Sequence, residues 1–232
     1  MVGKPVHSIL SWEPESREDL KYFRTIPWCS KIVSSPNIRP YQVTSPLRCD
    51  RGPDPVIHGF MFRQGGVLRH ASLLADPGTI PSLHVVDKPV IGGPGEEKPD
   101  QNTRLASLET TAEEEYPVHV DIFTFGDSLQ AVPGTIHGGV LTLLADGVCG
   151  KTAWMHRDPL KQVYTAYTNV RFIKPLLFGP DGTVTTVMKT QVIQELSTEG
   201  KIMVYATMEG PGGVVHATAE SMVVEKSWKG KL

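Results

Sequence analysis

Hydrophobic and polar positions alternate with a period of two from Val118 to Phe125, and four later stretches of the chain are strand-like in composition. Val, Tyr, Thr and Phe predominate in these stretches, which is typical of β-strands. We expect strands over Val118–Thr124, Val163–Ile173, Thr183–Gln194, Lys201–Met208 and Val214–Val224. Turns rich in Gly, Pro and Asp separate the last four. A helix followed by a four-strand meander, with no alternating βαβ units, predicts an α+β fold.

The stretch Val132–Gly150, VPGTIHGGVLTLLADGVCG, instead has helical spacing and predicts one buried helix with Thr135 as its N-cap. A second stripe of mostly small residues follows another face of this helix and contains one carboxylate, Asp146. An ionised carboxylate is costly to bury unless it is paired or has a chemical task. Asp146 is therefore the first candidate for chemistry, and the alternative is an aspartate on a solvated helix face.

The first half of the chain has weaker patterns. Its expected elements are a helix at Pro14–Arg24 that docks through Leu20 and Phe23, proline-rich irregular coil at Ser34–Pro55, a hairpin of Val56–Phe62 with Val67–Ala75, and a flexible segment at Asp76–Pro117. We therefore divide the chain into an N-terminal extension, residues 1–117, and a core, residues 118–232. No internal repeat indicates a second copy of the core.

Composition narrows the class of protein. The chain has 232 residues, 40% of them hydrophobic, and a formal net charge of −2, so neither nucleic acid nor a membrane surface is an expected partner. No apolar run approaches the roughly 20 residues of a membrane span. The three cysteines lack metal or disulfide spacing. These features and the absence of a signal-peptide core favour the cytoplasm, with the terminal GKL only a weak match to a peroxisomal signal.

The motif PGTIHGG, followed by Asp nine positions after its His, resembles the hotdog-fold acyl-CoA thioesterases of the PaaI/THEM type. The PWC at Pro27–Cys29 is similar to the fungal-type branch of that family. The resemblance covers Val118 to Val224 and implies a hotdog fold, in which a curved antiparallel sheet wraps one long helix. It also implies an acyl thioester substrate, carried by CoA or by a carrier protein, and hydrolysis without a cofactor or metal.

The resemblance assigns roles to four residues. Asp146 would act as general base on water or as nucleophile on the thioester, two roles that stay open. The backbone N–H of Gly138, at a helix N-terminus, would be the oxyanion donor. His137 would place the thioester, or would only cap the helix. The Thr165 hydroxyl would orient water or the acid, or Thr165 is simply a good strand former. We further expect substrate contacts from Gly139, Thr142 and Asn169.

Two features keep other functions open. Many PaaI-type members carry Asn six residues before the His of the motif, and Ala131 stands there in this chain. This departure and the long extension leave two alternatives: a hotdog enzyme of a biosynthetic pathway (dehydratase, cyclase or product-releasing hydrolase), or a non-catalytic binding protein. Gly138 and Asp146 are eight residues apart, or about 12 Å along one helix. One chain cannot bring both to one carbonyl, which predicts a homodimer, or a dimer of dimers, with shared sites.

Overall fold

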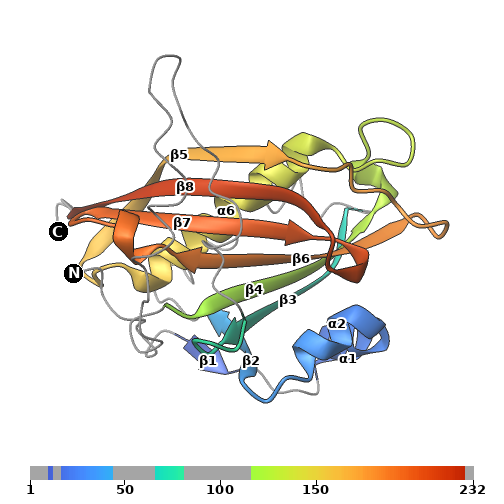
Figure 1. Ribbon diagram of the computed structural model, residues 1–232, viewed down its shortest axis with the longest axis horizontal. Coiled ribbons are helices and arrows are strands. Elements are labelled where there is room, and N and C mark those ends of the chain that lie inside the picture. Colours follow the sequence, from blue (N-terminus) through green and yellow to red (C-terminus); the bar gives the residue numbers. More distant parts are fainter. Residues whose placement is uncertain (1–9, 13–16, 44–65, 81–115, 228–232) are drawn as a thin grey trace, which may run out of the picture.

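The computed structural model describes residues 10–12, 17–43, 66–80 and 116–227. Within these residues, eight antiparallel strands form one sheet in the order β1-β2-β3-β4-β6-β7-β8-β5 (Figure 1). The strands are β1 (Leu10–Trp12), β2 (Ile38–Val43), β3 (Val67–Ala75), β4 (Val118–Gly126), β5 (Lys161–Phe172), β6 (Thr183–Val192), β7 (Lys201–Glu209) and β8 (Val215–Ser227). The helices are α1 (Glu18–Thr25), α2 (Pro27–Val33) and α6 (Gly138–His156), with short 3-10 turns η3 (Asp127–Leu129), η4 (Gln194–Leu196) and η5 (Pro211–Gly213).

The sheet is covered on both faces. On the face that we call inner, α6 packs against β5 to β8 through a core that includes Val140, Leu144 and Val148. The helices α1 and α2 lie on the outer face (Figure 1). Leu20 and Phe23 of α1 are buried there in a second core. An antiparallel sheet with a long helix on one face fits the hotdog fold that the resemblance implies.

The strand β4 is buried on both of its faces, which its sequence pattern does not indicate. All nine residues of β4 are buried, although its alternation is typical of a strand with one solvated face. Val120 and Ile122 belong to the outer core, whereas Phe123 and Phe125 belong to the inner core. His119 and Asp121 share the inner side with the two phenylalanines, and they receive polar partners rather than solvent.

The five strands expected after residue 117 are all confirmed within two or three residues at each end. The helix differs at both ends. It begins at Gly138, not beside Thr135, because Thr135 and Ile136 are extended and form β-bridges with Leu177 and Gln130. Its C-terminal end extends to His156.

The N-terminal expectations had mixed outcomes. A helix that buries Leu20 and Phe23 is confirmed, although its described part begins at Glu18. The interpretation of Ser34–Pro55 as coil is wrong at Ile38–Val43, which forms β2. Pairing of β2 with β3 ends at Pro40, which has no N–H to donate, and pairing with β1 begins at Tyr41.

Several expectations concern residues that the structure does not describe. Val67–Ala75 is a strand as expected, but its proposed hairpin partner, Val56–Phe62, lies outside the described residues. The same holds for most of the segment expected to be flexible, Asp76–Pro117. β3 pairs along its length with β4, so the sheet crosses the proposed boundary at residue 117. The division into extension and core stays a prediction. Among the described helices, none combines the length and apolar character needed to cross a membrane.

Candidate active site

The N-terminus of α6 leaves one backbone donor open. The Ile136 N–H donates to Leu176 O at 3.1 Å, and the His137 N–H donates to Leu129 O at 2.8 Å. His137 is the N-cap, since its Nδ1 accepts from the Gly139 N–H at 2.8 Å. Within the described part of the chain, the Gly138 N–H has no acceptor. Of the two glycine donors, Gly138 is therefore the one available to a ligand.

The capping bond also determines which nitrogen of the neutral His137 imidazole carries the proton. Because Nδ1 accepts a hydrogen bond, the neutral ring carries its proton on Nε2. The Thr142 hydroxyl donates to Gly138 O at 3.1 Å, within the first turn of the helix. Gly139 and Thr142 thus use these donors inside α6. Their expected contacts with substrate stay predictions.

Asp146 lies on the side of α6 that faces the edge strand β5. Its Oδ1 accepts a hydrogen bond from the Thr168 hydroxyl at 3.1 Å. The Thr168 hydroxyl also lies 2.9 Å from Ser221 Oγ on β8. No described residue donates to Asp146 Oδ2. The carboxylate is thus held by one oxygen, half-buried, with its second oxygen available to water or substrate.

The hydroxyl beside Asp146 belongs to Thr168 and not to Thr165, because β5 contains a bulge. The register with β8 shifts between Thr165 and Tyr167, which leaves Ala166 as an extra residue. A period of two from Thr165 would place Asn169 on the same face. The bulge instead brings Thr168 to the inner face and Asn169, which is exposed, to the outer one. Asn169 therefore faces away from the Asp146 of its own chain, and its expected contact with substrate stays a prediction.

Small residues on α6 let β5 approach the helix closely. A Cβ at Gly138 would lie 3.3 Å from Phe172 Cζ, and a Cβ at Gly150 would lie 3.9 Å from Thr165 Oγ1. These two contacts bracket the bond between Asp146 and Thr168, so helix and strand run antiparallel. Thr165 is thus one helical turn beyond Asp146, beside Gly150.

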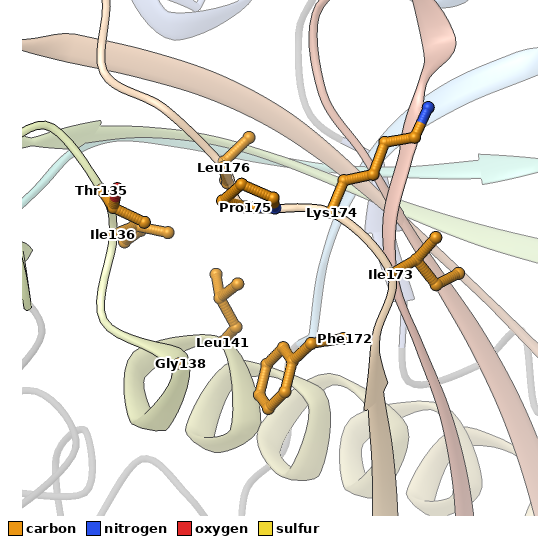
Figure 2. Close-up of a pocket in the computed structure, with 9 residues that line it drawn as sticks. All are labelled: Thr135, Ile136, Gly138, Leu141, Phe172, Ile173, Lys174, Pro175 and Leu176. Carbon is orange, nitrogen blue, oxygen red and sulfur yellow. The ribbon is translucent and has the colours of Figure 1, made fainter.

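An open, mainly apolar pocket of about 320 Å³ lies beside the first turn of α6. The Phe172 ring covers Gly138, and Leu141 forms the floor, whereas the Lys174 side chain extends outwards (Figure 2). The pocket is lined by Thr135, Ile136, Gly138, Leu141, Phe172, Ile173, Lys174, Pro175 and Leu176. Gly138, whose N–H has no acceptor among the described residues, thus borders a pocket with a hydrophobic wall.

A second polar cluster lies under the C-terminal half of α6. The Asp121 carboxylate on β4 is fully buried, and its Oδ1 accepts from Lys151 Nζ and, at 2.7 Å, from the Ser72 hydroxyl. His70 Nε2 lies 3.0 Å from the same oxygen. Burial alone would raise the pKa of Asp121, but the Lys151 ammonium and the His70 contact hold it below its ordinary value. Oδ2 is buried with no partner among the described residues.

A chain of three polar rings adjoins this cluster. The Tyr41 hydroxyl lies 3.1 Å from His119 Nδ1, and His119 Nε2 lies 2.9 Å from His156 Nε2. Burial, together with the neighbouring His156 and Lys151, holds the pKa of His119 well below its ordinary value. This imidazole is therefore neutral in the folded chain. Among the described residues, no group of three or more His, Cys, Asp or Glu has a metal-binding arrangement.

The sequence reasoning missed Thr168, Ser221 and the second cluster. Ser221 and Asp121 stand in stretches that alternate regularly, and neither belongs to a motif. The one available signal was the polar residue at an inward position of a buried strand, which applies to Asp121. Nothing in the sequence marks the bulge at Ala166.

No protein-family model matches the chain, and no curated protein matches it. Several solved structures resemble it over about half its length. A thioesterase from Haemophilus influenzae is 12% identical and covers 50% of this chain and 76% of its own, with a TM-score of 0.43. A hypothetical thioesterase with coenzyme A from Streptococcus pneumoniae is 14% identical, covers 47% and 79%, and has a TM-score of 0.40. A Streptococcus mutans protein bound to acetyl CoA is 16% identical, covers 47% and 82%, and has a TM-score of 0.39.

Proposed function

We propose that the protein hydrolyses an acyl thioester, carried by CoA or by an acyl-carrier protein, to the free acid and thiol. The observation that carries the proposal is the Asp146 carboxylate, held at Oδ1 by Thr168 and open at Oδ2. A base or nucleophile needs one fixed orientation and one free lone pair, and this arrangement supplies both. Membership of the PaaI/THEM type is part of the proposal and rests on the PGTIHGG motif with Asp nine positions after its His.

The oxyanion donor in this proposal is the Gly138 N–H. The thioester oxygen becomes negative in the tetrahedral transition state, and a backbone donor aimed at it is worth roughly 3 kcal/mol. Support comes from the position of Gly138 at the first residue of α6, where the helix dipole favours negative charge, and from its place in the apolar pocket. Water attacks the carbonyl carbon with Asp146 as base, or Asp146 attacks first and water cleaves the resulting anhydride.

The proposal requires two chains for each site. Gly138 and Asp146 are about 12 Å apart on one helix, so a second copy would bring its Gly138 to the Asp146 of the first. The edge strand β5 supports this arrangement. In the described part of the chain, no strand pairs with its outer edge, and Tyr164 and Tyr167 are exposed along it. A long exposed edge of this kind is normally covered. Thr168 lies on the same strand, close to where a partner would pair.

A panel of acyl-CoAs with a thiol-detecting reagent tests the proposal. The wild-type protein is expected to release CoA, and Asp146→Asn, which keeps the size of the side chain, should lower kcat by at least about a hundredfold. Tight binding without turnover would instead favour the non-catalytic binding protein. Water addition to an enoyl thioester, without thiol release, would favour the biosynthetic enzyme.

A further inference from the structure

Beyond the two groups proposed to meet the substrate, a chain of buried hydroxyls ends on Asp146. Thr168 donates its only proton to the carboxylate, because an ionised carboxylate only accepts. The bond between Thr168 and Ser221, at 2.9 Å, must therefore run from Ser221 to Thr168. Both hydrogen bonds of this hydroxyl series therefore point towards Asp146.

The inner end of this series of hydroxyls lies in the core. Ser221 and Cys149 are both completely buried, and Ser221 lies beside the Cys149 thiol. Burial raises the pKa of Cys149 to about 12, so the group is a neutral thiol. The donors of the hydroxyl series therefore run from Ser221 to Thr168 and from Thr168 to Asp146.

We infer that Ser221 is a positioning residue for the thioesterase reaction, which acts on Asp146 through Thr168. This inference rests on the proposed function. A hydroxyl that accepts a hydrogen bond becomes a stronger donor, so Ser221 strengthens the bond from Thr168 to Asp146 Oδ1. It also limits the rotation of the Thr168 hydroxyl. Both effects hold the carboxylate in one orientation, with Oδ2 directed to the reacting water or carbonyl.

Ser221 can hold the Thr168 hydroxyl because of where β8 lies in the sheet. The bulge at Ala166 weakens the pairing of β5 beside Thr168, and an edge strand has no second neighbour within the described chain. β8 lies between β5 and β7, so it is held on both sides. Ser221 pairs directly with Thr168 in the sheet. Ser221 on β8, which has a neighbouring strand on each side, thus holds the Thr168 hydroxyl on the edge strand β5.

A double-mutant cycle in the full-length protein tests the inference. Ser221→Ala should lower kcat for acyl-CoA by about three- to tenfold, as expected for one neutral hydrogen bond, with KM unchanged. Thr168→Val should lower kcat further. In the Thr168→Val background, Ser221→Ala should have no additional effect on kcat, because the Thr168 hydroxyl that links Ser221 to Asp146 is already gone.

The matched control is a second pair of buried hydroxyls between α6 and the sheet. Thr152 Oγ1 and Thr190 Oγ1 lie 2.7 Å apart and do not contact Asp146. Thr190→Val should lower the melting temperature by an amount similar to Ser221→Ala while leaving kcat within about twofold, since the helix itself stays in place. If Ser221→Ala fails to fold, Ser221→Cys keeps the size with a weak donor and should show the same dependence on Thr168.

Three results would separate the possibilities. A wild-type protein that releases no thiol refutes the proposed function itself. An active wild type, with a folded Ser221→Ala whose kcat is unchanged, refutes only the role of Ser221. A loss of kcat that is equal with and without the Thr168 hydroxyl also refutes it, because the effect of Ser221 would then not pass through Thr168.

Discussion

Thr168 on the edge strand donates a hydrogen bond of 3.1 Å to Asp146 on α6. This bond joins an exposed edge strand, β5, to the one carboxylate of α6. The bulge at Ala166 makes it possible, since it turns Thr168 towards the helix. The proposed chemistry thus depends on an irregularity in β5.

The first prediction separates the two threonines of β5. Thr168→Val keeps the shape of the side chain but removes the donor to Asp146, and kcat for acyl-CoA should fall by about tenfold or more. Thr165→Val should leave kcat within about twofold, because Thr165 lies beside Gly150. Steady-state kinetics of both variants check this. The opposite ranking would mean that the functional hydroxyl is Thr165, as the family resemblance implies.

The positions of these residues show what the sequence alone could predict. β4 could be predicted from alternation, and the later strands from their β-branched and aromatic residues and the turns between them. The predicted start of α6 is two residues too early: Thr135 has the side chain of an N-cap, but its backbone pairs with Leu177, and His137 caps instead. Likewise, a bulge depends on how two strands fit together, and one strand's residues do not specify it.

In the candidate site too, local signals could be read from the sequence, whereas long-range contacts could not. Asp146 and Gly138 were found from local signals: a charge among apolar residues, and a glycine at a helix start. Ser221 and Asp121 were not, since their partners Thr168 and Lys151 lie 53 and 30 residues away in sequence. Only the packed sheet brings such pairs together. β2 was missed because a proline inside a strand argues against the strand unless its neighbours are known.

The second prediction concerns the buried ion pair. Lys151→Met would leave the Asp121 carboxylate buried without its ammonium partner, and the free energy of unfolding should fall by about 3–5 kcal/mol. Adding Asp121→Asn to Lys151→Met should restore part of that stability, because the uncompensated charge is then gone. Urea unfolding of the three proteins measures both effects. A double variant less stable than Lys151→Met would argue against the ion pair as the source of the loss.

The third prediction is a pH dependence of stability caused by His119. Its pKa lies well below the ordinary value of 6.5 in the folded chain, so the unfolded chain binds a proton at a higher pH than the folded chain does. Stability from this group is therefore complete above about pH 6.5 and falls as pH decreases, by up to about 1.4 kcal/mol per pH unit. Asp121, whose pKa is also lowered, adds to this loss only below about pH 4.

Urea unfolding between about pH 4.5 and 6.5 isolates the His119 contribution, because Asp121 is ionised in both states over that range. His119→Gln supplies a donor and an acceptor without a titrating ring. Its stability should change less steeply with pH than that of the wild type, by about one proton in the slope. Equal slopes in the two proteins would show that His119 does not titrate differently on unfolding.

The last prediction is that each active site combines Asp146 of one chain with Gly138 of another. Two inactive variants test it. Asp146→Asn removes the carboxylate, and Gly138→Pro removes the proposed oxyanion N–H at a first-turn position where proline is tolerated. His137 already has the extended backbone, φ −69° and ψ 127°, that a residue before proline requires. Gly138→Ala is the matched control, because it adds a Cβ against Phe172 but keeps the N–H.

Co-expression with two different affinity tags isolates the mixed dimers. In a two-fold symmetric dimer with shared sites, one site carries both changes and the other carries neither. The mixed dimer should therefore recover about half of the wild-type activity, although each variant alone is inactive. Gly138→Ala should retain most activity, which assigns the loss in Gly138→Pro to the N–H. If folded mixed dimers stay inactive, Asp146 and Gly138 do not belong to shared sites, because two-chain sites require that one site in each mixed dimer be intact.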